Sequence, residues 1–337
     1  MGNIIIPSIY TFLQLIIFMI FGFFLSKALR WPKIFFKHIG LFIINFALPL
    51  YFFTNISKTD KASVMQGIIF PPFALLYLIV MFLISYLIYT LFKIKGSEKR
   101  AGVALSTFGN SGYIPLSLIE IFPITLPFLV TKFDPKISTL FVGTYLLINS
   151  PLLWSIGNFL VAGKGAYPKP KEFFTPPLAG IIAGLLVVIL GAQNFFLNKE
   201  LPFYYIFTAF EKIGSTTLPF IMITLGSMIA DIKIDPETKK GLTLNFSLVF
   251  LIRFILSPLL YWILFFLVIK NLKPTPIQNW VIFLEMHTPA ATNLSVMAHK
   301  VEQNENLISF SLLFSYIFFL ILLPVYIFLF ILFAGNY

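Results

Sequence analysis

The residues best suited to chemistry lie in two short stretches of similar composition within an otherwise apolar chain. Residues 109–115, with the sequence GNSGYIP, contain two glycines, an asparagine, a serine and a proline. Residues 288–293, with the sequence TPAATN, repeat the proline, the small residues, the hydroxyls and the asparagine. An asparagine side chain both donates and accepts hydrogen bonds, so Asn110 can bridge the backbone and a bound anion. We predict that the substrate-binding residues are Gly109, Asn110, Ser111, Gly112, Pro115, Thr288, Pro289, Thr292, Asn293 and, on an earlier segment, Asn45.

Both stretches should interrupt a helix. Gly109 and Gly112 allow backbone angles that a helix excludes, and Pro115 removes a donor and clashes with the carbonyl four residues earlier. In hydrocarbon, irregular backbone persists only where it is buried in protein or lines a cavity. We therefore predict an unwound segment near residues 109–113 and a matching one at Pro289, which cross each other. The half-helices that follow would direct N–H groups and positive dipole ends at one cavity suited to an anion, most simply a carboxylate. The alternative is that each proline only kinks its helix.

The composition indicates an integral membrane protein. Hydrophobic residues make up 58% of the 337 residues and charged residues only 11%, whereas a soluble domain carries about a quarter charged residues. The chain has no cysteine, which excludes disulfides, thiol chemistry and the usual cysteine-based metal sites; we expect no metal site and no cofactor. The net charge of +11 is typical of basic loops that face the cytoplasm, so nucleic acid is not an expected partner.

Ten apolar segments are long enough to cross a bilayer, for which about 20 residues suffice. They predict an all-α polytopic membrane protein with spans at residues 6–27, 38–56, 65–92, 101–122, 137–162, 175–192, 203–230, 241–269, 277–299 and 307–334. In the first half, basic connections alternate with weakly charged ones. The positive-inside rule then places both termini on the extracellular side of the cytoplasmic membrane.

Four prolines of the first half have counterparts in the second half at nearly one offset. The offsets are 170, 170, 174 and 173 positions for the pairs Pro7 and Pro177, Pro49 and Pro219, Pro115 and Pro289, and Pro151 and Pro324. We infer a duplication, with repeats at residues 1–163 and 164–337. Each half holds five spans, an odd number, so the two halves have opposite orientations in the membrane. Inverted repeats of this kind are typical of secondary transporters.

Ionisable residues inside a membrane are functional candidates. Glu285 lies one helical turn before Pro289 and can share its face. It is a candidate to carry a coupling proton or to bind Na⁺; the alternative is an interfacial residue near the outer end of its span. His287 is a candidate proton relay. Arg253 either neutralises a carboxylate or extends to the membrane surface.

Several motifs resemble those of the auxin efflux carrier family, over essentially the whole chain. They are residues 108–116, 175–180, 218–219 with 225–227, 253–259, and 288–293 with 298–300. This family includes plant auxin exporters and microbial carriers of malate, malonate and related carboxylates. The resemblance implies two inverted five-helix repeats, with broken spans 4 and 9 crossing at the substrate site. It further implies an elevator-like movement of spans 3–5 and 8–10 against scaffold spans 1, 2, 6 and 7, which can also form a homodimer.

The sequence thus predicts a secondary transporter for a small organic anion, auxin-like or a dicarboxylate, rather than an enzyme. A passive anion uniporter or channel on the same scaffold is one alternative. Another comes from residues 109–112, which also match the G-x-S-G motif of rhomboid-type intramembrane serine proteases. Ser111 would then be the nucleophile and His287 its base, because a serine nucleophile needs a base within hydrogen-bonding reach.

Overall fold

Every regular element in the described part of the computed structural model is a helix. The structure describes residues 2–125, 133–163, 173–231 and 239–334. The predicted repeat boundary, after residue 163, borders residues 164–172, which lie outside these ranges. The elements of the first half are α1 (Gly2–Lys27), α2 (Lys33–Phe42), η1 (Ile43–Ala47), α3 (Leu48–Ile56), α4 (Lys61–Gly67), α5 (Phe70–Leu91), α6 (Gly96–Thr107), α7 (Tyr113–Thr125), α8 (Pro135–Leu152), η3 (Leu153–Gly157) and α9 (Asn158–Ala162).

The second half continues with a similar series. In both halves, the elements labelled η are short π-helical turns inside longer helices. Its elements are α10 (Pro176–Ile189), α11 (Gln193–Leu197), α12 (Pro202–Ser215), α13 (Thr217–Asp231), α14 (Lys239–Phe250), η6 (Leu251–Leu256), α15 (Ser257–Leu264), η7 (Phe265–Ile269), α16 (Lys270–Leu272), α17 (Pro276–Met286), α18 (Asn293–Val301) and α19 (Glu305–Phe333).

Six continuous helical stretches of the described residues are long and apolar enough to cross a membrane. They are Lys33–Ile56, Lys61–Leu91, Pro135–Ala162, Pro202–Ala230, Leu242–Leu272 and Glu305–Phe333. The apolar stretches Ile16–Lys27 and Pro176–Ile189 are shorter, and the predicted spans 4 and 9 are each divided into two pieces. The predicted all-helical membrane class is confirmed, while the arrangement of ten spans stays a proposal.

Local sequence signals explain where several helices begin. Asp60 precedes α4 and accepts a hydrogen bond from the Ser63 backbone N–H at 2.7 Å, the usual role of an aspartate at a helix N-cap. Thr275 and Gln278 form a reciprocal capping box at the start of α17, which satisfies two of the helix's free N–H groups. Proline occupies the first turn of α5, α8, α10, α12 and α17, where its missing N–H costs nothing.

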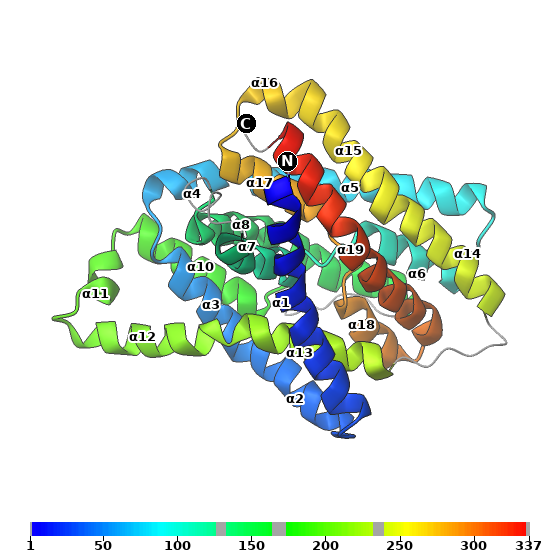
Figure 1. The fold of residues 1–337 in the computed structure, drawn as a ribbon, viewed down its shortest axis with the longest axis horizontal. Coiled ribbons are helices and arrows are strands. Elements are labelled where there is room, and N and C mark those ends of the chain that lie inside the picture. The colour runs from blue at the N-terminus through cyan, green and yellow to red at the C-terminus, as the bar shows by residue number, and fades with distance from the viewer. Residues whose placement is uncertain (1, 126–132, 164–172, 232–238, 335–337) are drawn as a thin grey trace.

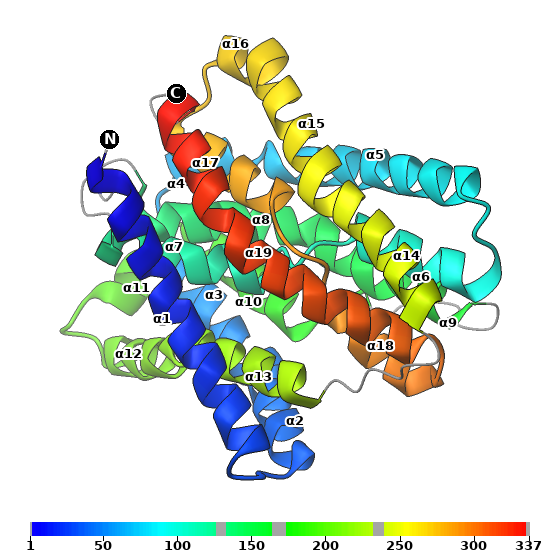
Figure 2. The same ribbon diagram turned by 45° about the vertical axis from the view of Figure 1, so that its right-hand side comes forward.

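Helices from the two halves pack against each other at glycines. α1 crosses α13 (Figures 1 and 2), and a Cβ on Gly22 would lie 1.9 Å from the Ile223 carbonyl oxygen. On α13, a Cβ on Gly226 would likewise lie 1.9 Å from the Met19 carbonyl oxygen of α1. Small residues allow membrane helices to approach this closely and gain dispersion contacts. α3 packs in the same way between α10 and α12.

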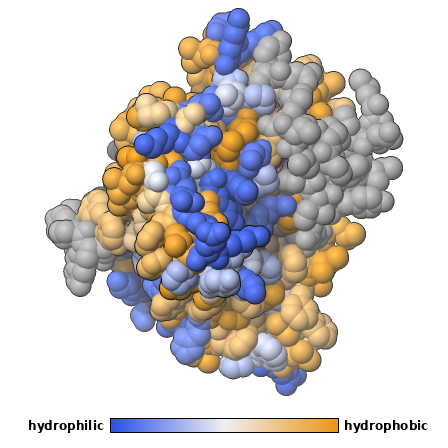
Figure 3. Space-filling model, turned by 90° about the vertical axis from the view of Figure 1, so that its left-hand side faces the viewer, coloured by the Kyte–Doolittle hydropathy of each residue, from blue (hydrophilic) through white to orange (hydrophobic). Residues whose placement is uncertain are grey.

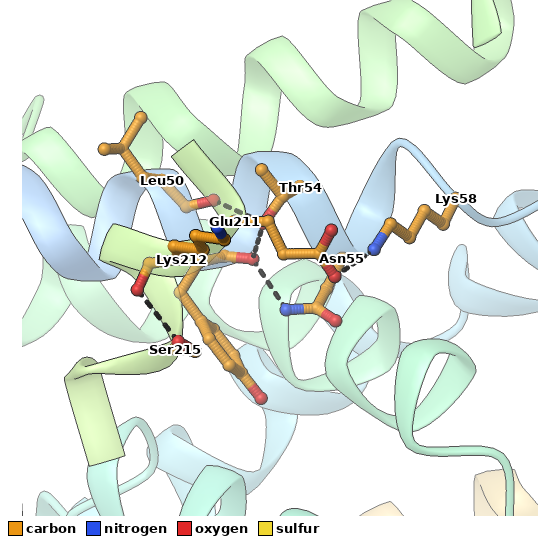
Figure 4. A network of polar contacts seen from close by, with 8 residues as sticks. Leu50, Thr54, Asn55, Lys58, Glu211, Lys212 and Ser215 are labelled. Atoms are coloured by element: carbon orange, nitrogen blue, oxygen red, sulfur yellow. Dashed lines mark hydrogen bonds and ion pairs between the residues drawn. The ribbon is translucent and has the colours of Figure 1, made fainter. Parts of the chain in front are cut away.

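An ion pair joins α12 to the turn that follows α3. The Lys58 ammonium donates to the Glu211 carboxylate, and both side chains are partly exposed (Figure 4). On α3 itself, Thr54 and Asn55 donate to the carbonyls of Leu50 and Tyr51, so their polar groups are satisfied within the helix. This ion pair therefore helps to hold helices of the two halves together.

Large apolar side chains are exposed on many of the described helices. On α5, Leu76, Leu83 and Leu87 are each more than half exposed, and their spacing places them on one face of the helix. The end of the molecule that carries α4 and α11 faces the viewer in Figure 3, where a strip of hydrophilic residues runs between hydrophobic ones. α19 runs beside α14 in both ribbon views (Figures 1 and 2).

Candidate functional site

The two predicted helix breaks exist, and they cross. α6 ends at Thr107 and α7 begins at Tyr113, while α17 ends at Met286 and α18 begins at Asn293. The Asn110 N–H donates to the Pro289 carbonyl at 2.8 Å, and the Ala291 N–H donates to the Phe108 carbonyl at 3.0 Å. The crossing backbones thus form a single antiparallel β-bridge, between Gly109 and Ala290. Each break supplies hydrogen bonds to the other, which is how irregular backbone is tolerated away from water.

The glycines of the first break are there for a different reason from the one predicted. Among the described glycines, positive φ angles occur at Gly96, Gly163 and Gly191, and not at Gly109 or Gly112. Gly109 is required by space: a Cβ there would lie 2.1 Å from Nη2 of Arg253 and 2.2 Å from Oγ1 of Thr288. At Gly112 the nearest atom to such a Cβ would be 3.8 Å away. The first glycine therefore permits close packing, and the second has room around it.

Asn110 and Pro115 together define where α7 begins. The Asn110 side-chain oxygen accepts a hydrogen bond from the Tyr113 N–H at 3.1 Å, which caps the new helix. Its amide nitrogen donates to the hydroxyl of Tyr316 on α19. Pro115 lies in the first turn of α7, where a proline does not break a helix but is well tolerated. Asn110 thus bridges two protein elements rather than standing free for a ligand.

A cavity of about 380 Å³ opens beside the crossing point. The first residues of both α7 and α18 line it, so the N-terminal ends of both second half-helices reach the same space. Its other walls carry the side chains of Leu146, Trp154, Phe174 and Leu178 and the amides of Asn149 and Asn158. Among the described lining residues, Lys300 alone is charged. The cavity therefore combines apolar walls, helix N-termini and one positive charge.

Six of the ten predicted binding residues line this cavity: Gly109, Asn110, Ser111, Gly112, Thr292 and Asn293. Pro115, in the first turn of α7, and Thr288 and Pro289, in the second break, are not among the lining residues. Asn45 is exposed on η1 and donates to the Leu41 carbonyl of its own helix at 2.8 Å. Its neighbours Ile44 and Leu48 line the cavity instead, because a helix turns each successive side chain by about 100°.

Several lining residues were not among the predicted binding residues. Asn149, Trp154 and Asn158 lie on the continuous helical stretch Pro135–Ala162, and Lys300 lies on α18, far away in the chain. Lys300 had a local signal, a cation in the last turn of the helix after the second break. The others had none, because a single asparagine or tryptophan in an apolar helix is most often a packing residue.

Glu285 and His287 lie behind the crossing, apart from the residues that line the cavity. Both side chains are fully buried within the protein, and both interpretations of Glu285 stay predictions. His287 donates from Nδ1 to the Phe283 carbonyl at 2.7 Å and packs against the rings of Phe283 and Tyr326. Within the described residues no hydrogen bond joins it to Ser111. Arg253 is also fully buried, which excludes an extension to the membrane surface.

Crossed helix breaks in an apolar helical protein, with a small cavity at the crossing, are features of membrane transporters. Comparison with protein families agrees. The family described as "Membrane transport protein" matches residues 7–172 and 166–327, and the chain belongs to this family. The resemblance to auxin efflux carriers is therefore confirmed, and the protein is a multi-pass membrane transporter.

One curated plant protein is also similar. Protein PIN-LIKES 7 of Arabidopsis thaliana is 28% identical over 153 residues, which are 44% of this chain and 37% of the plant protein. The match spans little more than a third of that relative, so it supports kinship and does not transfer the relative's activity.

Proposed function

We propose that this protein is a secondary transporter that moves a small organic anion, a carboxylate, across the cytoplasmic membrane. The observation that carries the proposal is the cavity at the crossing, where the N-termini of α7 and α18 and the charge of Lys300 meet. Helix N-termini carry partial positive charge and free N–H groups, and they favour anions. The volume of about 380 Å³ lies within the usual range for small-molecule sites.

The apolar walls suggest how the rest of the substrate is held. Trp154, Phe174 and Leu146 offer contact area to a carbon skeleton, and the amides of Asn149 and Asn158 can fix further polar groups. Lys300 lies seven positions after Asn293 on α18, roughly 10 Å along the helix axis. The cavity thus has two positive regions, the helix N-termini and the Lys300 ammonium. A monocarboxylate would bind at one of them, and a dicarboxylate would bind at both.

The same proposal includes the inverted repeat and the elevator-like movement. The proposed scaffold consists of α1, α2–α3, α10 and α12–α13, which pack on one another through the close contacts and the ion pair described above. The proposed moving part contains both helix breaks. Leu48 and Leu178 line the cavity from the scaffold side, and Thr292 and Asn293 line it from the moving part. A substrate held between the scaffold and the moving part would travel with the moving part. A homodimer would form through the scaffold, with both termini outside the cell.

The coupling ion is also part of the proposal. Glu285 and His287 are the candidates for a proton-coupled step, since they are buried ionisable groups directly behind the crossing. Such groups inside membrane proteins are commonly functional.

The test is uptake of labelled malate, malonate and indole-3-acetate into proteoliposomes, with and without an imposed proton gradient. We expect saturable uptake of at least one acid and exchange counterflow when the vesicles are preloaded with the same acid. Flux that rises linearly with concentration and shows no counterflow would indicate a channel and would contradict the proposal. Stimulation by the gradient would support proton coupling, and indifference to it would leave Glu285 and His287 without that role.

A further inference from the structure

The cavity opens at one end of three helices that enclose it. Leu48 and Leu178 line it from the first turns of α3 and α10, and Trp154 lines it from the second half of the long helix that begins with α8. Phe174 and Lys300 also line it, and both side chains are exposed. The rim of the cavity therefore lies at this end, which we call the open end.

The same three helices pack closely on one another at their other end. Ile56, the last residue of α3, has no exposed surface. A Cβ on Gly143 of α8 would lie 3.1 Å from Cδ1 of Ile56, and a Cβ on Gly184 of α10 would lie 2.8 Å from the Ile56 Cβ. The buried hydroxyls of Tyr51 on α3 and Thr139 on α8 also share a hydrogen bond at 3.4 Å. Ile56 thus fills the space that the two glycines leave, beyond the lining residues of all three helices.

The open end is also the more basic end. It leads to residues 27–37, through α2, and to residues 163–175, between α9 and α10. These two segments hold seven basic residues and one acidic residue. The opposite end leads to residues 57–61, 132–136 and 190–201, which hold five basic residues and three acidic ones. By the positive-inside rule, the open end faces the cytoplasm.

We propose that this structure is the cytoplasm-facing state of the transporter, with Ile56 as its outer seal between Gly143 and Gly184. Ile56 and Gly184 belong to the proposed scaffold, and Gly143 belongs to the proposed moving part. α8 must therefore leave Ile56 before the acid can reach the outer side, and in this state the acid binds from the cytoplasm. Ile56 is a positioning residue that does not touch the acid. This inference rests on the proposed transport function and adds the contact that must break.

The first test asks which side of the membrane has access to the cavity. Ser150, a lining residue, is replaced by Cys and treated with a membrane-impermeant thiol reagent in right-side-out and in inside-out vesicles. Ser97→Cys marks the cytoplasmic side and Lys199→Cys the outer side. We expect Ser150→Cys to react from the cytoplasmic side, and from the outer side at no more than about a tenth of that rate, the upper population of a typical minor state. A faster reaction from the outer side would overturn the inference.

The second test asks whether Ile56 is the seal. Ile56→Val removes only Cδ1, the atom that contacts the Gly143 position, and is combined with Ser150→Cys. We expect the labelling rate from the outer side to rise roughly fivefold, as the loss of one buried methyl group allows, and to rise further with Ile56→Ala. Ile68→Ala is the matched control, because Ile68 follows α4 at the same end of the molecule and is exposed.

An unchanged rate from the outer side in both Ile56 variants would overturn the role of Ile56. The labelling rates do not depend on uptake. A protein that is labelled as expected but shows no saturable uptake would therefore contradict the transport proposal and leave the sidedness of the cavity established.

Discussion

Asn110 is the residue through which the crossing, α7 and α19 are joined. Its backbone N–H bonds to the other break, its side-chain oxygen caps α7 and its amide nitrogen bonds to Tyr316. It also lines the cavity. A side chain with these connections positions the binding surface even where it does not itself reach the substrate.

Asn110→Ala should therefore keep the fold and lose most of the transport. The lost cap costs about 1 kcal/mol, which a folded membrane protein can bear, while uptake should fall roughly tenfold or more. Asn45→Ala is the matched control, because Asn45 is exposed and bonds only within its own helix. Uptake and thermal unfolding of both variants are measured together. Equal uptake by the two variants would show that Asn110 does not organise the site.

Lys300 provides the one charge among the described lining residues. Lys300→Gln should raise the KM for a carboxylate by roughly tenfold, which corresponds to about 1.4 kcal/mol, with little change in maximal rate. Lys300→Arg keeps the charge and should stay near wild type. Inhibition of uptake by the uncharged methyl ester of the same acid should be weak in both. An unchanged KM in Lys300→Gln would place the anion elsewhere.

At the scale of elements, the two interrupted helices decide what the site can be. Residues 109–113 and Pro289 could be predicted as breaks because glycine and proline act locally, and their crossing followed from the repeat. The reason for Gly109 could not be predicted. It depends on Arg253, which is distant in sequence and approaches only in the folded protein. Asn45, a predicted binding residue, does not line the cavity, because the rotation of its helix relative to the crossing is set by packing on other helices.

The two glycines of the first break offer a matched pair of substitutions. Gly109→Ala should destabilise the protein by about 3 kcal/mol, as an overpacked core position does, because its Cβ would overlap Arg253 and Thr288. Gly112→Ala should change stability by less than about 1 kcal/mol, since the nearest atom is 3.8 Å from its Cβ. Both changes in stability are measured from the unfolding temperatures of the purified variants in detergent. A Gly109→Ala variant as stable as Gly112→Ala would disprove the tight packing of the crossing.

At the scale of the whole molecule, the cavity lies where two groups of helices meet. Leu178 lines it from α10 and Asn293 from α18. Lys58 and Glu211, in contrast, join two elements of the proposed scaffold (Figure 4). The residues that complete the cavity, such as Trp154 and Lys300, could not be predicted together from the sequence, because only the packing of separate helices brings them to one place.

An elevator-like movement should be blocked by cross-links across this boundary and tolerate cross-links within the scaffold. The chain has no native cysteine, so a thiol cross-linker can react only with the introduced cysteines. The pair Leu178→Cys and Asn293→Cys, joined by a flexible thiol cross-linker, should abolish uptake. The pair Lys58→Cys and Glu211→Cys, joined in the same way, should leave most of it. Full uptake after cross-linking the first pair would rule out relative movement of the two groups.

The proposed function depends on an anion that binds in the cavity beside the crossing. It is tested most directly by labelling a single cysteine there. Ser150 lines the cavity, whereas Ser97 lies in the first turn of α6, away from the lining residues. The rate at which a water-soluble thiol reagent modifies Ser150→Cys is measured with increasing concentrations of the transported acid, with Ser97→Cys as the control. We expect saturable protection of Ser150→Cys, with a half-maximal concentration near the KM for uptake, and no protection of Ser97→Cys. Labelling of Ser150→Cys at the same rate with and without the acid would contradict it.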